Sequence, residues 1–249
     1  MAVDVNARNL QAELMDDPSL NDVAHRQALM GLRRINSWSR ADAAVWKVIR
    51  EFGAESSAAK PLTILDIASG GGDLAVRLAR SARRDRISLA VDGCDISPTA
   101  IAFASEQAAA AKFTNIKFHQ CNALEQPFPR AKYDIVMCSL FLHHLTQEHA
   151  VRLLERMKSA TNRLVLIDDL RRTRFGYLLA WLGCRALTRC RVVHLDGPMS
   201  VEGAFTTEEV RLIAESAGLS GAIIRPHWPQ RLLLTWRPEN GGVDEHSRI

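Results

Sequence analysis

The residues most suited to chemistry lie in one short stretch, residues 63–73, in which two aspartates flank three glycines. An apolar run ends at Asp66, a glycine triplet follows at 70–72, and Asp73 begins an amphipathic segment. This order predicts a buried strand, a sharp turn whose backbone lies close to a ligand, and the N-terminus of a helix. Glycine suits such a turn because a residue without Cβ lets the main chain bend and approach a bound group.

The two acidic side chains indicate which cofactor the turn favours. Gly70, Gly72 and Ala75 fit the loose dinucleotide pattern G-x-G-x-x-A, whose pyrophosphate would lie at the helix N-terminus. Asp66 and Asp73 would repel it, by ~4 kcal/mol for a charge pair about 4 Å apart at an effective dielectric of about 20. S-adenosylmethionine has an ammonium group and a sulfonium but no phosphate, so the same carboxylates favour it. Asp73 has the alternative role of a first-turn acid in the helix.

A third aspartate ends the next predicted strand, at residues 87–95. Asp95 lies about 20 residues past the glycine turn, where a carboxylate can accept both hydroxyls of a ribose. Ile96 would then pack against an adenine ring. Ser97 suits the N-cap and Pro98 the first position of a following helix, so a shared capping role is the alternative for Asp95.

Four motifs together resemble the class I S-adenosylmethionine-dependent methyltransferases of the small-molecule, UbiE-like type. They lie at residues 65–72, 93–97, 121–123 and 133–145, and the resemblance extends over residues 62–236. It implies that S-adenosylmethionine is the cofactor. The implied cofactor-binding residues are Asp66, Ala68, Ser69, Gly70, Gly72, Asp95, Ile96, Asn122, Ala123, Cys138 and Ser139.

Two positions depart from the family pattern. Ala68 stands where the motif D-x-G-x-G-x-G has its first glycine, and we expect only a slightly different turn because alanine is small. Asn122 precedes Ala123 where the family commonly has aspartate. Its amide oxygen can still accept a hydrogen bond from the adenine amino group, although without a negative charge.

Length and composition agree with one intracellular α/β enzyme. The 249 residues suffice for one such domain with a cap, and 47% apolar and 24% charged residues are ordinary values. No secretory signal and no run of ~20 apolar residues is visible, so we expect a cytoplasmic protein. The five cysteines have no C-x-x-C spacing, which argues against disulfides and against a zinc site, so no metal is expected.

Alternating strands and helices predict an α/β, Rossmann-like fold with a mostly parallel seven-stranded sheet. The turn between residues 222–225 and 231–236 is too short for a parallel crossover, so the sheet should end in an antiparallel hairpin. Further predicted elements are helices at 73–83, 98–111 and 147–160 and strands at 115–120, 133–139 and 163–168.

We divide the chain into three segments. Residues 1–60 form a predicted N-terminal helical cap, with helices near 22–35 and 40–52 and a break at Asn36-Ser37. Residues 61–238 form the methyltransferase domain, and 239–249 read as a disordered polar tail.

A helical insertion at residues 170–200 is the second informative feature. Residues 171–191 contain six arginines and no acid around the apolar run 175–183. We interpret the insertion as a lid with arginines in solvent, and the alternatives are a lipophilic tunnel or a helix resting on an anionic membrane surface. The acceptor is therefore expected to be small and aromatic or lipophilic, of phenolic or polyketide-like type, with peripheral membrane contact through 171–191. The oligomeric state stays open.

Histidines are the candidate bases, because methylation of a hydroxyl requires removal of its proton near neutral pH. His143 and His144 follow the predicted strand 133–139, and ordering of their loop is the alternative role. His194 precedes Asp196 in a predicted turn, which could instead be a plain surface turn. His227 is a further candidate.

Two alternative functions can be weighed against the sequence motifs of this chain. An RNA or tRNA methyltransferase would commonly carry Asn/Asp-Pro-Pro-Tyr/Phe after the strand at 133–139, and a basic, aromatic-rich module. The chain has Cys-Ser-Leu-Phe at 138–141 and no such module, which argues against a nucleic-acid acceptor. A non-catalytic, methyltransferase-like binding subunit is the other alternative. The nearly intact donor motifs favour a working enzyme over it.

Overall fold

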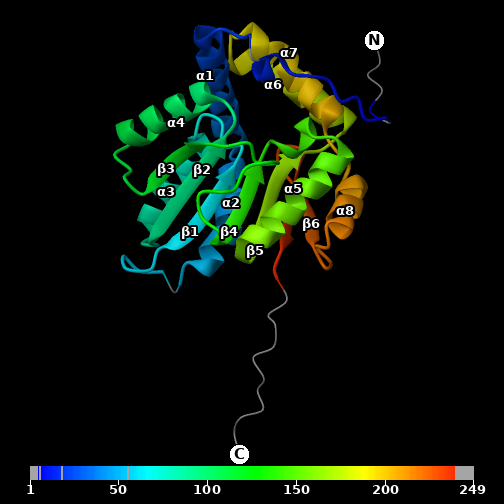
Figure 1. Cartoon of the computed structure of the whole chain (residues 1–249). Coiled ribbons are helices and arrows are strands. Elements are labelled where there is room, and N and C mark those ends of the chain that lie inside the picture. Colours follow the sequence, from blue (N-terminus) through cyan, green and yellow to red (C-terminus); the bar gives the residue numbers. More distant parts are fainter. Residues whose placement is uncertain (1–4, 6, 18, 55, 239–249) are drawn as a thin grey trace, which may run out of the picture.

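A seven-stranded sheet forms the middle layer of the computed structural model, which describes residues 5, 7–17, 19–54 and 56–238. The strand order is β3-β2-β1-β4-β5-β7-β6 (Figure 1). The strands are β1 (Leu62–Ile67), β2 (Leu89–Asp95), β3 (Ile116–Gln120), β4 (Tyr133–Ser139), β5 (Thr161–Leu170), β6 (Ile223–His227) and β7 (Arg231–Trp236). Strands β1 to β5 pair in parallel, and β7 is antiparallel to β5 and β6. The predicted Rossmann-like sheet with its terminal antiparallel hairpin is confirmed.

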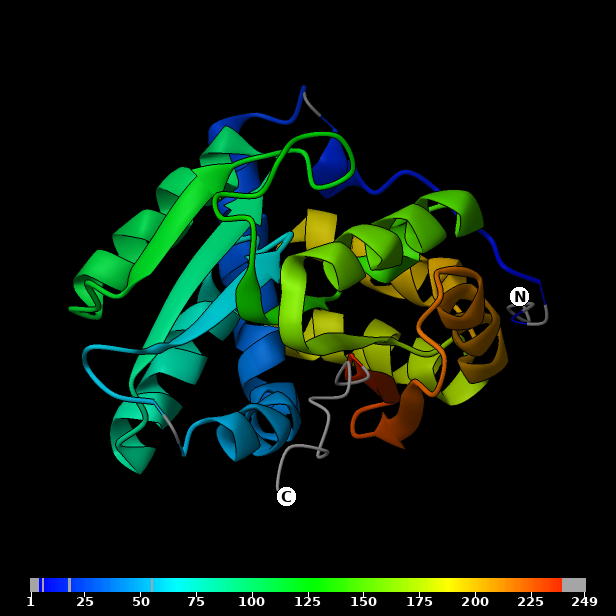
Figure 2. The ribbon, with the colours of Figure 1, turned by 60° about the horizontal axis from the view of Figure 1, so that its bottom comes forward.

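Helices cover both faces of this sheet (Figures 1 and 2). They are α1 (Asp22–Ser39), α2 (Ala41–Ile49), α3 (Asp73–Asp85), α4 (Pro98–Ala110), α5 (Gln147–Ala160), α6 (Arg174–Leu187), α7 (Arg191–Gly203) and α8 (Thr207–Ser216). Short 3-10 helices are η1 (Leu14–Asp16), η2 (Arg50–Phe52) and η3 (Leu142–His144).

The central strands are buried on both faces because successive side chains point to opposite sides of a sheet. Ile64 of β1 belongs to the core that includes Ile49 of α2. The next residue, Leu65, belongs to the core that includes Leu153 of α5. Helices α2 and α3 thus cover one face, and α5 and α8 cover the other.

The N-terminal helices differ from the predicted boundaries. The break expected at Asn36-Ser37 is wrong, since α1 continues to Ser39 and ends at Arg40, whose φ is +52°. The carbonyl oxygen of Asn36 accepts hydrogen bonds from Ser39 Oγ at 3.0 Å and Arg77 Nη1 at 2.9 Å. Arg77 belongs to α3, so a contact from a distant part of the chain helps to place the end of this helix. The tail predicted at 239–249 lies outside the described residues.

The insertion at 170–200 forms two helices, α6 and α7, which lie with α1 beyond the carboxyl ends of the parallel strands (Figure 1). The turn predicted around His194 is wrong, because residues 191–203 form α7 with Pro198 inside it. The carboxylate of Asp196 accepts hydrogen bonds from the backbone N–H groups of Leu14 and Met15, both at 3.0 Å. This partner from the N-terminal segment is invisible in the local sequence.

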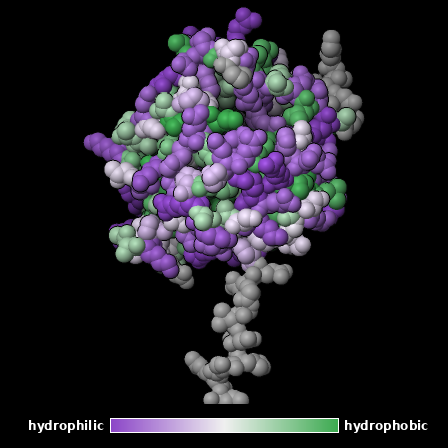
Figure 3. All heavy atoms as spheres, viewed as in Figure 1, coloured by the Kyte–Doolittle hydropathy of each residue, from purple (hydrophilic) through white to green (hydrophobic). Residues whose placement is uncertain are grey.

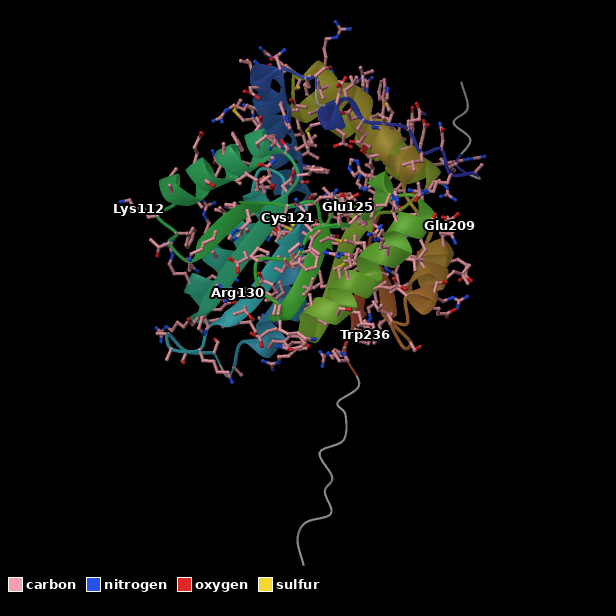
Figure 4. All side chains as sticks on the ribbon, in the orientation of Figure 1. Lys112, Cys121, Glu125, Arg130, Glu209 and Trp236 are labelled. Atoms are coloured by element: carbon pink, nitrogen blue, oxygen red, sulfur yellow. The ribbon has the colours of Figure 1, made fainter. Side chains whose placement is uncertain are left out.

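The arginines of the insertion are not all in solvent, contrary to the simple lid interpretation. Arg172 is buried, and its guanidinium contacts both carboxylate oxygens of Glu209, at 2.9 and 2.7 Å. Glu209 lies in the first turn of α8 (Figure 4), so this pair ties the start of the insertion to the helix that follows it. Paired Arg–carboxylate contacts of this kind are geometrically specific.

No helix among the described residues is long and apolar enough to cross a membrane. On the face shown in Figure 3, hydrophobic residues lie in small groups among mostly hydrophilic ones.

Candidate active site

Four strand ends bring the predicted cofactor residues to one edge of the sheet. The strands β3, β2, β1 and β4 are neighbours in this order and run in parallel, so their carboxyl ends meet there. Ligands of open α/β sheets bind outside this edge. The motifs that follow Ile67, Asp95 and Cys138 are therefore close in space although they are far apart in sequence.

The glycine turn after β1 has a left-handed backbone at three positions. The φ angles are +54° at Ala68, +49° at Gly70 and +71° at Gly72. A Cβ on Gly72 would lie 2.6 Å from the ring of Phe118, so close packing requires glycine there. A Cβ on Gly70 would meet no atom within 4 Å, so Gly70 faces open space that a ligand could occupy. Ala68 keeps the turn conformation at a steric cost of ~1–2 kcal/mol.

Asp66 is a buried carboxylate that lacks a partner. It is 2% exposed, and its Oδ2 has no hydrogen bond, as is also true of Ser69 Oγ in the same turn. Burial, and then the charges of Asp73 and Asp95, raise the pKa of Asp66 to about 8. A buried polar atom without a partner costs free energy that a bound ligand can recover. A cationic group would fit these residues, because it would supply a partner and relieve the acidic repulsion.

Asp95 holds the glycine turn in position. Its Oδ2 accepts a hydrogen bond from the backbone N–H of Gly70 at 2.8 Å, and its Oδ1 accepts one from Ser97 at 2.9 Å. Ser97, rather than Asp95, caps α4 through its hydroxyl. Each carboxylate oxygen keeps acceptor capacity for a hydroxyl. Ile96 is 65% exposed at the tip of β2, which leaves its side chain free to pack on a ring.

Asp73 has the structural role that the alternative interpretation assigned to it. It lies in the first turn of α3, and its Oδ2 accepts from Arg77 at 3.1 Å and from Asn36 at 3.4 Å. Arg77 therefore neutralises part of the negative charge at the turn.

Asn122 orders its own loop after β3, where Cys121 and Glu125 are labelled in Figure 4. Its Oδ1 accepts from the N–H of Leu124 at 3.0 Å, and its backbone N–H donates to Gln126 at 2.7 Å. One lone pair of the amide oxygen stays available for an adenine amino group. The neighbouring Ala123 is buried, and its carbonyl oxygen accepts from Arg156 at 2.7 Å.

At the end of β4 the two predicted residues differ in what they could contact. Cys138 is fully buried, so its side chain packs in the core and only its backbone could face a ligand. Ser139 lies at the strand end, and its hydroxyl donates to Asp168 Oδ2 at 3.0 Å.

The histidines predicted as bases have separate surroundings. His143 is buried, with Nδ1 2.6 Å from Asp169, and His144 has Nδ1 2.8 Å from Asp16. Burial alone would lower the pKa of His144, but the hydrogen bond to Asp16 and the charge of Glu13 raise it to about 9. His194 lies inside α7 with Nε2 2.8 Å from the carbonyl oxygen of Thr188. Asp196 binds the N-terminal segment instead, so the structure does not pair it with His194 as orienting acid.

Asp168 was not predicted as a site residue, although it lies between two residues that were, Ser139 and His227. Oδ1 of Asp168 is 2.8 Å from His227 Nε2, and Oδ2 accepts from Arg231 Nη1 at 2.8 Å as well as from Ser139. Burial opposes its charge, but Arg231 and then His227 hold the pKa of Asp168 below its usual range. The only sequence signal was an acid at the end of an apolar strand.

The glycine turn after β1, the acid that ends β2 and the antiparallel final strand agree with the resemblance to the class I S-adenosylmethionine-dependent methyltransferases. Residues 64–163 match the methyltransferase domain family.

The curated relatives that this chain matches are also named as methyltransferases. The chain is 31% identical over 148 residues to a demethylmenaquinone methyltransferase of Deinococcus radiodurans, covering 59% of this chain and 54% of that protein. It is also 31% identical over 109 residues to a 27-O-demethylrifamycin SV methyltransferase of Amycolatopsis mediterranei, covering 43% and 38%. The match thus spans about half the length of the first of these relatives, and less of the second.

Solved structures share the fold at low identity. A magnesium protoporphyrin IX methyltransferase from Synechocystis with bound SAH has a TM-score of 0.55 at 18% identity, covering 90% of each chain. A putative O-methyltransferase from Nostoc punctiforme has a TM-score of 0.64 at 17% identity, covering 93% of this chain and 64% of that one.

Proposed function

We propose that the protein transfers a methyl group from S-adenosylmethionine to a small aromatic or lipophilic acceptor, by O- or C-methylation. The observation that carries this proposal is the buried, unpaired carboxylate of Asp66 in the turn where Gly70 faces open space. An ammonium group would supply the missing hydrogen-bond donor and a sulfonium would add positive charge, whereas a pyrophosphate would add negative charge beside Asp66 and Asp95. We also propose that the enzyme is cytoplasmic.

For the cofactor we assign roles to residues at the ends of four strands, β1, β2, β3 and β4. Asp66, Ala68, Ser69, Gly70 and Gly72 would surround its methionine part. Asp95 would accept from the ribose hydroxyls, Ile96 would pack on the adenine, and Asn122 and Ala123 would border its amino group. Cys138 and Ser139 would lie beside the sulfur through the end of β4.

The chemistry required of the protein is mainly alignment, because methyl transfer is an in-line displacement at the donor methyl group. For the base that an oxygen acceptor needs, we propose His227 in preference to His143, His144 or His194. Asp168 fixes one ring nitrogen of His227 and also binds Ser139, which links the histidine to the end of β4. A carboxylate that orients a histidine is a recurrent arrangement for general bases.

The exposed face of α6 supports a lipophilic acceptor. Phe175, Leu178 and Leu182 are exposed at helical spacing, and Trp181 lies beside them. Four arginines of the insertion are also exposed: Arg174, Arg185, Arg189 and Arg191. An apolar helix face with basic flanks suits contact with an anionic membrane surface, from which a lipophilic acceptor would be drawn. Sedimentation with anionic vesicles tests this contact, and equally strong binding to neutral vesicles would contradict the charge argument.

A transfer assay with tritium-labelled methyl donor tests the function. Purified protein is offered a panel of phenolic and quinol-type small molecules and, in parallel, tRNA. Label in the small-molecule fraction supports the proposal, and label in RNA alone would reverse it. Donor binding in calorimetry without transfer to any acceptor would favour a non-catalytic subunit, and binding of NAD instead of the donor would remove the methyltransferase assignment.

A further inference from the structure

Three metal-ligating side chains converge beside the carboxyl edge of the sheet. One oxygen of Glu13 and one nitrogen each of His143 and His144 lie within 4.8 Å of one another. Glu13 immediately precedes η1 in the N-terminal segment, and the two histidines belong to η3 after β4. Glu13 and His143 are buried and His144 is half-buried, so this is not a group of solvated surface residues.

Both imidazole rings are oriented by carboxylates that lie outside the cluster. His143 Nδ1 is 2.6 Å from Asp169, and His144 Nδ1 is 2.8 Å from Asp16. Each ring therefore directs Nε2 to the same carboxylate oxygen, Glu13 Oε1, at 3.8 and 4.0 Å. Protein metal sites use this pattern, in which a ligating histidine donates its other N–H to a carboxylate.

The separations are too long for hydrogen bonds but suit a bridging ion. Zinc binds histidine nitrogen and carboxylate oxygen at about 2.0–2.2 Å, so two ligands of a tetrahedral ion lie ~3.4 Å apart. Glu13 would need to approach by about half an ångström. Ser200 Oγ, which donates to Glu13 Oε1, already holds that carboxylate in place from α7.

Charge also favours a cation here. Three carboxylates, those of Glu13, Asp16 and Asp169, surround two imidazoles. Within the described part of the chain, Glu13 forms ion-pair contacts with His143 and His144 and with no arginine or lysine. The nearby guanidinium of Arg8 donates instead to backbone carbonyl oxygens, including those of His143 and Leu145.

We propose that Glu13, His143 and His144 bind a divalent transition-metal ion of the zinc type. Two histidines and one glutamate form a known zinc donor set, which leaves a fourth position open. The ion would join the N-terminal segment to η3 and so close the segment over the edge of the sheet. The expectation of no metal rested on the cysteine spacing, and none of these ligands is a cysteine.

Titration of the metal-free protein with Co²⁺ tests the site without any methyl transfer. We expect one ion per chain with the visible absorption bands of tetrahedral Co²⁺, displacement by Zn²⁺, and a higher melting temperature with Zn²⁺. Glu13→Gln, which retains shape and hydrogen bonding, and His143→Ala should each abolish the bands. Asp169→Asn should weaken the affinity about 10–100-fold. The matched control is His149→Ala, at an exposed position of α5.

Each outcome either supports or overturns the proposed metal site. Loss of binding in Glu13→Gln, with an unchanged circular dichroism spectrum and normal binding in His149→Ala, supports the site. Absence of binding by the unmodified protein, or equal binding by Glu13→Gln, overturns it and leaves the cluster as a set of ion pairs. Because the readout is spectroscopic, failure of the proposed methyl transfer would leave this result unaffected.

Discussion

Binding of S-adenosylmethionine should release a proton from Asp66. In the free protein, burial and then the charges of Asp73 and Asp95 raise the pKa of this carboxyl to about 8, so it is largely protonated near neutral pH. A bound cation beside the carboxylate favours its charged form and lowers the pKa again. The binding equilibrium and the protonation equilibrium are therefore linked.

The size of the effect follows from this pKa. A carboxyl group with a pKa of about 8 is about 0.9 protonated at pH 7 and about 0.2 protonated at pH 8.5. If the cofactor returns Asp66 to an ordinary pKa, binding should release about 0.9 proton at pH 7 and about 0.2 at pH 8.5. Calorimetry in buffers with different heats of ionisation measures the number directly.

Asp66→Asn is the matched control, because it has a similar shape and cannot titrate. Any proton exchange by the cofactor's own amino group is common to both proteins, so the difference between them reports Asp66 alone. Equal proton release by the two proteins, or no dependence on pH, would refute the electrostatic account of the turn.

The same shift sets the sign of the pH dependence of stability. The folded pKa of Asp66 lies above the ordinary value of 3.8, so its contribution to stability is fully present below about pH 4 and is lost as the pH rises through about 8. The free energy of unfolding of the cofactor-free protein should fall between about pH 4 and about pH 8 and level off above that. Urea unfolding of Asp66→Asn should show a smaller fall.

Three further substitutions test the site. Ala68→Gly should stabilise the protein by ~1 kcal/mol in urea unfolding, because φ is +54° there; a loss of stability would contradict the strain argument. Asp95→Ala should weaken cofactor binding by ~1.5–3 kcal/mol in calorimetry, and unchanged affinity would argue against its ribose role. His227→Ala should lower kcat for an oxygen acceptor by about 10²–10⁴-fold with little change in cofactor affinity, whereas an unaltered kcat would exclude it as the base.

Local pattern was sufficient for much of the fold. The predicted strand 133–139 and helix 147–160 coincide with β4 and α5, because each has a clear apolar period and each is bounded by turn residues. The glycine turn and Asp95 were placed at strand ends by the same logic, and parallel strands bring their carboxyl ends to one edge. Sequence alone thus determined the sheet, its hairpin and the candidate cofactor turn.

Tertiary structure decided what the polar side chains at that edge contact. His144 is paired with Asp16, 128 residues away, and Asp168 with His227, 59 residues away. Asp196, in the helix that contains His194, likewise accepts hydrogen bonds from the backbone of the N-terminal segment. Periodicity reports which face of an element is buried, but the charge and protonation of a buried group depend on partners that only folding brings within hydrogen-bond distance.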